Sequence, residues 1–152
     1  MRKIESFQVN HDTLQKGMYI SRVDQDIVTY DIRMKVPNTG DYLDNAVIHT
    51  FEHLFATYIR NSKWAESIVY VGPMGCLTGF YLLVRDSISH EDAITLMQES
   101  CRFISSFESE IPGAEKVECG NYLLHDLQKA KALAADFAEI IVNWTVKDMR
   151  YT

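Results

Sequence analysis

The segment from Asp44 to Asn61 joins an apolar stripe to a compact polar arc, and it restricts the fold more than any other part of the sequence. Apolar side chains recur at the spacing of one helix face, at Phe51, Leu54, Phe55 and Tyr58. With His49 at 0° on a helical wheel, Glu52 falls at about 300° and His53 at about 40°, away from that stripe. We therefore expect a helix that packs its stripe on a core and presents two imidazoles and a carboxylate on its other side.

The rest of the chain predicts an α+β fold. Alternation, turn residues and capping signals indicate four strands and two further helices. The strands are expected over Ile27–Val36, Ser67–Val71, Thr78–Arg85 and Lys116–Leu124, and the helices over Ser89–Ser106 and Asp126–Val142. With 152 residues and no linker or repeat, we expect a single domain over residues 1–152. Its mostly antiparallel sheet would carry the helices on one face.

Charge and hydropathy exclude several classes of partner. The 21 acidic residues outnumber the 15 lysines and arginines, for a formal charge of −6, which opposes binding to nucleic acid or to anionic membranes. The longest purely apolar run, Phe80–Val84, is far too short to span a membrane. No signal peptide is visible, and the three cysteines leave an odd thiol under any pairing. We expect a cytoplasmic protein with free thiols.

The polar arc has the form His-x-x-Glu-His, which is typical of a metal site on a helix. Imidazoles at positions i and i+4 reach one divalent ion, and the neighbouring carboxylate can act on a bound water or substrate. A pair of solvated or core histidines is the alternative interpretation, but a buried, unpaired Glu52 would then be costly. At least one more ligand is needed, and the candidates are Cys119, His125, His11 and Cys76.

Two of the three cysteines are candidates for a chemical role, one as a metal ligand and one as a group that exchanges protons. Cys119 can serve as a thiolate ligand, although taken alone a cysteine is more often a small apolar core residue. Cys76 lies between two glycines, in Gly75-Cys76-Leu77-Thr78-Gly79, where its sulfur is accessible. Near a cation such a thiol can exchange protons at neutral pH, and the alternative is a core residue at the start of a strand. Cys101 falls on the apolar face of the second helix and is expected in the core.

Several segments together resemble the LuxS family, the S-ribosylhomocysteine lyases. They are residues 49–56 (HTFEHLFA), 72–81 (GPMGCLTGFY) and 119–122 (CGNY), with shorter matches at 5–7, 31–33, 36–38 and 125–128. The similarity runs from about Ile4 to Ile141 in the same order and at comparable spacing. Each segment is weak evidence alone, and their joint occurrence makes the resemblance specific.

The resemblance implies a metal-dependent carbon–sulfur lyase. The metal ligands would be His49, His53 and Cys119, holding ferrous iron that zinc or cobalt can replace. Glu52 and Cys76 would carry protons. The substrate would be S-ribosylhomocysteine, and the products would be homocysteine and 4,5-dihydroxypentane-2,3-dione, the precursor of autoinducer-2.

The resemblance also implies a homodimer with two active sites at the subunit interface. Ser6, His11 and Arg33 match positions that line the substrate pocket of the family. From the residues alone, Asp31 and Arg33 share the polar face of their strand and could be a solvated pair at a sheet edge, whereas the resemblance favours a pocket role for Arg33. Tyr70 and Leu77 depart from the family pattern near the turn that contains Cys76.

Two other functions remain open from the sequence. An inverted His-x-x-Glu-His metallopeptidase would use Glu52 as general base and a carboxylate as third ligand, from Glu115 or Glu118. The chain is short for a peptidase cleft, and that function leaves Cys76 unexplained. The second is a metal-binding paralogue without catalytic activity. The presence of both Glu52 and Cys76 argues against it.

Overall fold

The computed structural model describes all residues 1–152, and a four-stranded antiparallel sheet forms its framework. The spatial order of the strands is β1-β2-β4-β3. Their bounds are Gly17–Asp24 for β1, Ile27–Arg33 for β2, Ile68–Pro73 for β3 and Gly79–Arg85 for β4. Strands β2 and β4 are therefore central, and strands β1 and β3 form the edges.

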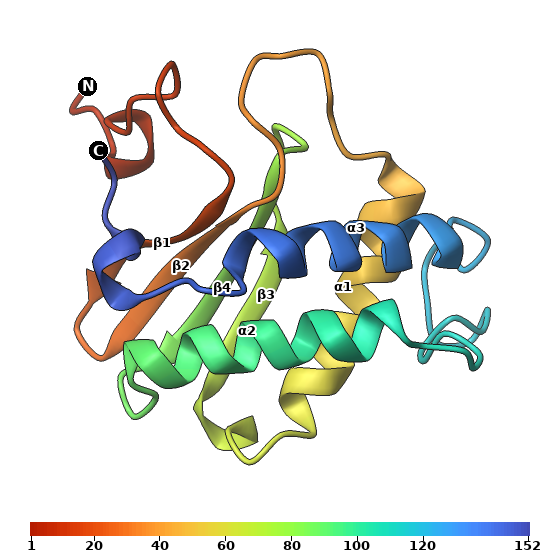
Figure 1. Ribbon diagram of the computed structural model, residues 1–152. Helices are drawn as coiled ribbons and strands as arrows, with labels where there is room; N and C mark the ends of the chain where they lie inside the picture. The colour runs from red at the N-terminus through yellow and green to blue at the C-terminus, as the bar shows by residue number, and fades with distance from the viewer.

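Three helices cover one face of this sheet. They are α1 (Asn45–Arg60), α2 (His90–Ser105) and α3 (Leu127–Ile141), with short 3-10 helices η1 (Glu5–Phe7), η2 (Ala65–Ser67) and η3 (Val146–Met149) elsewhere. Figure 1 shows α2 and α3 side by side across the sheet, with α1 next to them. Alternate residues of β2, such as Tyr30 and Ile32, join the core beneath the helices. The predicted α+β fold with helices on one face is confirmed.

The starts of α2 and α3 follow from their capping residues. The Ser89 hydroxyl accepts a hydrogen bond from the Asp92 backbone N–H, and the Asp126 carboxylate accepts one from the Lys129 N–H. Each bond satisfies a backbone donor that has no partner within the helix, so each helix begins where the sequence predicts. None of the helices has both the length and the apolar character needed to cross a lipid bilayer.

The predicted strand over Lys116–Leu124 is wrong. This segment consists of turns whose backbone bonds are local, such as Cys119 N–H to the Glu115 oxygen and Leu124 N–H to the Asn121 oxygen. The apolar residues Val117 and Leu123 are exposed, so no buried face holds the segment extended. The long connection between α2 and α3 therefore lies outside the sheet.

Strands β1 and β2 also differ from the sequence prediction. Strand β1 was not predicted, because its apolar and polar residues alternate over only part of its length. Strand β2 ends at Arg33 rather than Val36. The N–H groups of Met34 and Lys35 both donate to the Thr78 oxygen, so the chain leaves the regular ladder there.

Central strand β2 is buried on both faces, and it carries an ion pair on the face without helices. Asp31 and Arg33 are only 1% and 3% exposed, so the alternative of a solvated edge pair is wrong. The Tyr151 hydroxyl donates to Asp31 Oδ2 at 2.7 Å. The Tyr151 ring stacks on the Tyr19 ring, with centroids 5.1 Å apart. The C-terminal residues thus cover the pair, and Figure 1 shows the two chain ends close together at that side.

Gly79 tests how the turn between β3 and β4 enters β4, where this residue packs against strand β2. A Cβ at this position would overlap the backbone oxygen of Ile32, whereas a Cβ at Gly75 meets nothing within 4 Å. We expect Gly79→Ala to lower the free energy of unfolding by about 1–3 kcal/mol, as overpacking does. Gly75→Ala is the matched control and should stay near wild type in urea unfolding. Equal midpoints for both variants would contradict this description of the turn.

Candidate metal centre

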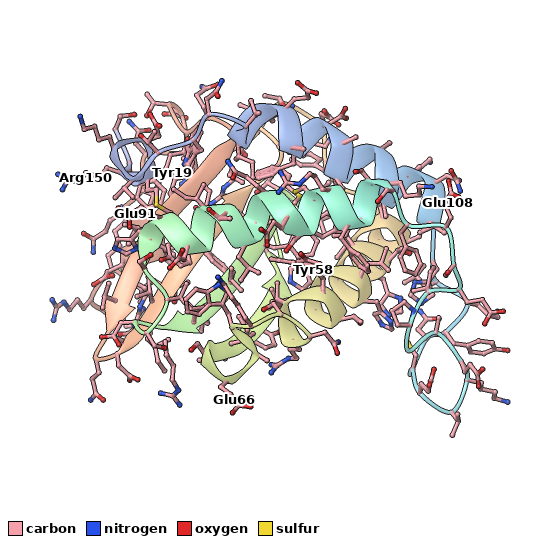
Figure 2. The ribbon with its side chains drawn as sticks, turned by 60° about the horizontal axis from the view of Figure 1, so that its bottom comes forward. Tyr19, Tyr58, Glu66, Glu91, Glu108 and Arg150 are labelled. Carbon is pink, nitrogen blue, oxygen red and sulfur yellow. The ribbon has the colours of Figure 1, made fainter.

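Four metal-binding side chains converge beside the N-terminal half of α1. His49 and His53 come from α1, and Cys119 and His125 come from the connection between α2 and α3. Their candidate ligand atoms all lie within 4.8 Å of one another. Figure 2 shows the segment that follows Glu108 looping out beside α1. Helix and loop, far apart in sequence, together form this donor cluster.

Hydrogen bonds to the loop orient both histidines of α1. His49 Nδ1 lies 2.7 Å from the Leu124 oxygen, and His53 Nδ1 lies 2.8 Å from the Pro112 oxygen. A carbonyl only accepts, so each Nδ1 carries the hydrogen and each Nε2 keeps its lone pair. Metal-binding histidines commonly show this pattern, in which an outer partner fixes the tautomer.

The spacing of the donors fits a divalent ion. Cys119 Sγ and His49 Nε2 are 3.4 Å apart, close to the edge of about 3.6 Å that a tetrahedral site with one sulfur and one nitrogen would have. The His49 and His53 rings meet nearly edge to face, with centroids 4.5 Å apart and planes at 85°. Two imidazoles and one thiolate leave a fourth position of a tetrahedral ion open, as in catalytic sites.

Beside the two histidines of α1 and Cys119, the acidic residues and His125 determine which chemistry the cluster can support. Glu52 is half-buried on α1 and makes no hydrogen bond or ion pair within the chain. Burial, together with the neighbouring His49 and His53, lowers the pKa of His125. Glu115 and Glu118 stand outside the donor cluster, so the carboxylate third ligand that a peptidase would need is absent.

Cys76 belongs to a second cluster, at the turn between β3 and β4. Its sulfur is exposed and lies 3.0 Å from Thr78 Oγ1 and 3.9 Å from Arg33 Nη1. Arg33 also donates to Thr78 Oγ1 at 2.8 Å and binds Asp31 through two nitrogens, at 3.1 and 2.7 Å. Sequence reasoning did not find Thr78 or the Tyr151 contact to Asp31, since both depend on strand pairing and on the path of the C-terminus.

Ser6 and His11 both lie on the N-terminal segment that precedes β1. Ser6, on η1, helps to line a hollow of about 460 Å³ on the helix-free face of the sheet, near Tyr70 and Tyr81. His11 Nδ1 lies 2.9 Å from the Val9 oxygen. No hydrogen bond or ion pair joins Ser6 or His11 to the donor cluster or to Arg33 within the chain.

Comparison with known proteins identifies the family. The family model for LuxS, described as S-ribosylhomocysteinase, matches residues 4–148. The chain belongs to the LuxS family. It is 47% identical to the S-ribosylhomocysteine lyase of Phocaeicola vulgatus, over 99% of this chain and 97% of that protein. It is 43% and 46% identical to the lyases of Desulfotalea psychrophila and Porphyromonas gingivalis, over 99% of each chain.

This membership confirms the resemblance seen in the sequence and excludes the metallopeptidase alternative. As a LuxS protein the chain is a carbon–sulfur lyase, and its donor cluster is a metal-binding site. The roles of the individual residues in that site stay predictions, because neither the family match nor the donor cluster distinguishes ligands from proton carriers.

Removing one proposed ligand at a time tests the donor set. We expect His49→Ala, His53→Ala and Cys119→Ala each to lose bound metal, because each removes one of three ligands. Cys101→Ala is the control: this thiol is buried in the core, where burial raises its pKa to about 12. Elemental analysis after metal loading measures occupancy. Full occupancy in a ligand variant would remove that residue from the set.

Proposed function

We propose that this LuxS-family chain cleaves the thioether of S-ribosylhomocysteine at an ion held by His49, His53 and Cys119. The observation that carries this proposal is the donor set itself. Two imidazoles and a thiolate converge beside α1, which also carries the Glu52 carboxylate without a protein partner. The products are homocysteine and 4,5-dihydroxypentane-2,3-dione, the precursor of autoinducer-2.

The chemistry of the substrate explains why such a site is needed. Its carbonyl stands at C1 and its sulfur at C5, so the carbon–sulfur bond is not activated for cleavage. Moving the carbonyl to C3 places the sulfur β to it, and elimination can follow. A divalent ion supplies Lewis acidity toward the substrate oxygens during these shifts. Each shift also removes a proton from one carbon and adds one to its neighbour, which requires positioned acids and bases.

Glu52 and Cys76 are the proton carriers in this proposal. The Glu52 carboxylate has no hydrogen-bond or ion-pair partner in the chain, so its oxygens are free for a substrate proton. The Cys76 thiol is exposed and lies near the Arg33 guanidinium. The thiolate is the form of a cysteine that accepts a proton. The hydroxyl of Thr78 holds the sulfur in place.

The substrate pocket is completed by a second copy of the chain. We assign Arg33, Ser6 and His11 to substrate contacts, although no hydrogen bond or ion pair joins Ser6 or His11 to the donor cluster within one chain. The helix-free face of the sheet offers an interface, since it holds the hollow near Ser6 and exposes Tyr70 to 55%. A homodimer with two sites at the interface would bring these groups together.

Ferrous iron is the proposed ion, with zinc or cobalt as substitutes. A site of two imidazoles and one thiolate binds any of these divalent ions, so the donor set alone does not select among them. We propose the cytoplasm as the place of action, because all three cysteines are free and two of them need reduced sulfur for their proposed roles.

Substitution of the proton carriers separates catalysis from metal binding. We expect Glu52→Gln and Cys76→Ala to keep the fold and the metal but to lose about 10²–10⁴-fold in homocysteine release, as loss of a general acid or base does. A thiol-reagent assay on metal-loaded protein measures the rate, with Cys101→Ala as the control that should stay active. Near-normal release by Cys76→Ala would overturn the two-carrier mechanism.

Mixing two inactive variants tests the shared site. If each site combines His11 of one chain with Cys119 of the other, His11→Ala and Cys119→Ala homodimers are both inactive. Random re-association of equal amounts should then restore about a quarter of wild-type activity, since half the dimers are hybrids with one intact site of two. Light scattering should report a dimer throughout. No recovery in confirmed hybrids would show that both residues act within one chain.

A further inference from the structure

His125 has a hydrogen-bonding atom with no partner. Its Nε2 is buried and contacts no donor or acceptor of the chain, and it is the only buried side-chain nitrogen or oxygen in that state. One ring nitrogen of His125 belongs to the donor cluster, whose ligand atoms lie within 4.8 Å of one another. Because Nδ1 is paired with the Thr50 hydroxyl, Nε2 is the nitrogen left free for a partner at the cluster. A buried polar atom left unpaired is costly, so its persistence here calls for a partner from outside the chain.

The contacts of Thr50 determine which nitrogen of His125 carries the hydrogen. The Thr50 hydroxyl oxygen accepts from the Asp126 backbone N–H at 2.9 Å and lies 3.0 Å from His125 Nδ1. The structure shows no other acceptor for the hydroxyl hydrogen, so that hydrogen is donated to Nδ1. The Nε2 of His125 is then an N–H donor. His49 and His53 are in the opposite tautomer, because carbonyl oxygens face their Nδ1 atoms.

The orientation of the ring gives an independent argument against metal ligation by His125. An imidazole lone pair lies in the plane of its ring, so a bound ion lies near that plane. The His125 ring is stacked on His49, with planes 16° apart and centroids 4.1 Å apart. An ion in the plane of His49 therefore lies well outside the plane of His125. His49 and His53, whose planes are 85° apart, can share one ion.

We propose that His125 is a neutral hydrogen-bond donor, through Nε2–H, to the substrate oxygen that enters the open side of the donor set. This inference rests on the lyase function proposed above. An oxygen that gains negative charge as an enediolate forms is the acceptor that such a donor favours most. The Thr50 hydroxyl acts as the positioning group, since it fixes the tautomer of His125 while Asp126 N–H holds the hydroxyl in place.

The tautomer can be observed directly, without an activity assay. Long-range ¹H–¹⁵N correlation spectra of the zinc-loaded wild-type protein, labelled at histidine nitrogens, distinguish a protonated Nδ1 from a protonated Nε2. We expect Nε2–H for His125 and Nδ1–H for His49 and His53. A His125 Nε2 without hydrogen and bound to zinc would overturn the proposal in favour of a fourth protein ligand. This measurement stands even if the chain proved inactive on S-ribosylhomocysteine.

Variants at His125 and Thr50 test the effect on catalysis. We expect His125→Phe to bind cobalt with affinity within about tenfold of wild type and to keep the thiolate-to-cobalt absorption band, since no ligand is lost. Its kcat for homocysteine release should fall about 10²-fold, as for loss of one oxyanion donor, with little change in KM. Unchanged kcat, or cobalt affinity lowered more than 10²-fold, would contradict the proposal.

The pair Thr50→Val and Thr50→Ser supplies the matched control. Valine has the shape of threonine but no hydroxyl, so the tautomer of His125 is no longer fixed and kcat should fall. Serine keeps the hydroxyl and should retain most of the activity and the Nε2–H signal. Equal activity of the two variants, with both folded and metal-loaded, would show that Thr50 does not act through His125.

Discussion

Two hydrogen bonds from the imidazoles of α1 hold the connection between α2 and α3 against that helix, and the metal centre depends on them. The connection has no regular structure of its own, so its position follows from contacts such as His49 Nδ1 to the Leu124 oxygen and His53 Nδ1 to the Pro112 oxygen. These contacts place Cys119 3.4 Å from His49 Nε2. The same bonds set the tautomer that exposes both ligand lone pairs. The hydrogen bonds that place the loop therefore also orient the two histidine ligands.

The sheet positions the side chains of Arg33 and Cys76. Asp31 and Arg33 are buried on strand β2, and burying two charges is favourable only with good geometry and further hydrogen bonds. Thr78 and Tyr151 supply those bonds. The fixed guanidinium then lies near the exposed Cys76 sulfur. In one chain the metal donors sit on a helix and loop, while this thiol and arginine sit at the end of the sheet.

The sequence predicted what short-range patterns encode. Helix α1, the cap at Ser89, the start of α3 at Asp126, and the two histidines on one arc follow from local spacing and were found as predicted. Features that depend on distant segments were missed or wrong. The segment Lys116–Leu124 has strand-like residues but no neighbouring strand to pair with, and the burial of Asp31 depends on the C-terminal Tyr151. His125 was one of several possible ligands, and its contact with Thr50 and its stacking on His49 distinguish it.

X-ray absorption spectroscopy of the zinc-loaded protein tests the central claim most directly, because it counts the atoms around the ion. The account predicts one sulfur at about 2.3 Å and three nitrogen or oxygen atoms at about 2.0–2.1 Å. Imidazole scattering should correspond to two rings. A zinc shell without sulfur, or with three imidazoles, would contradict a site of two histidines and one thiolate with an open position.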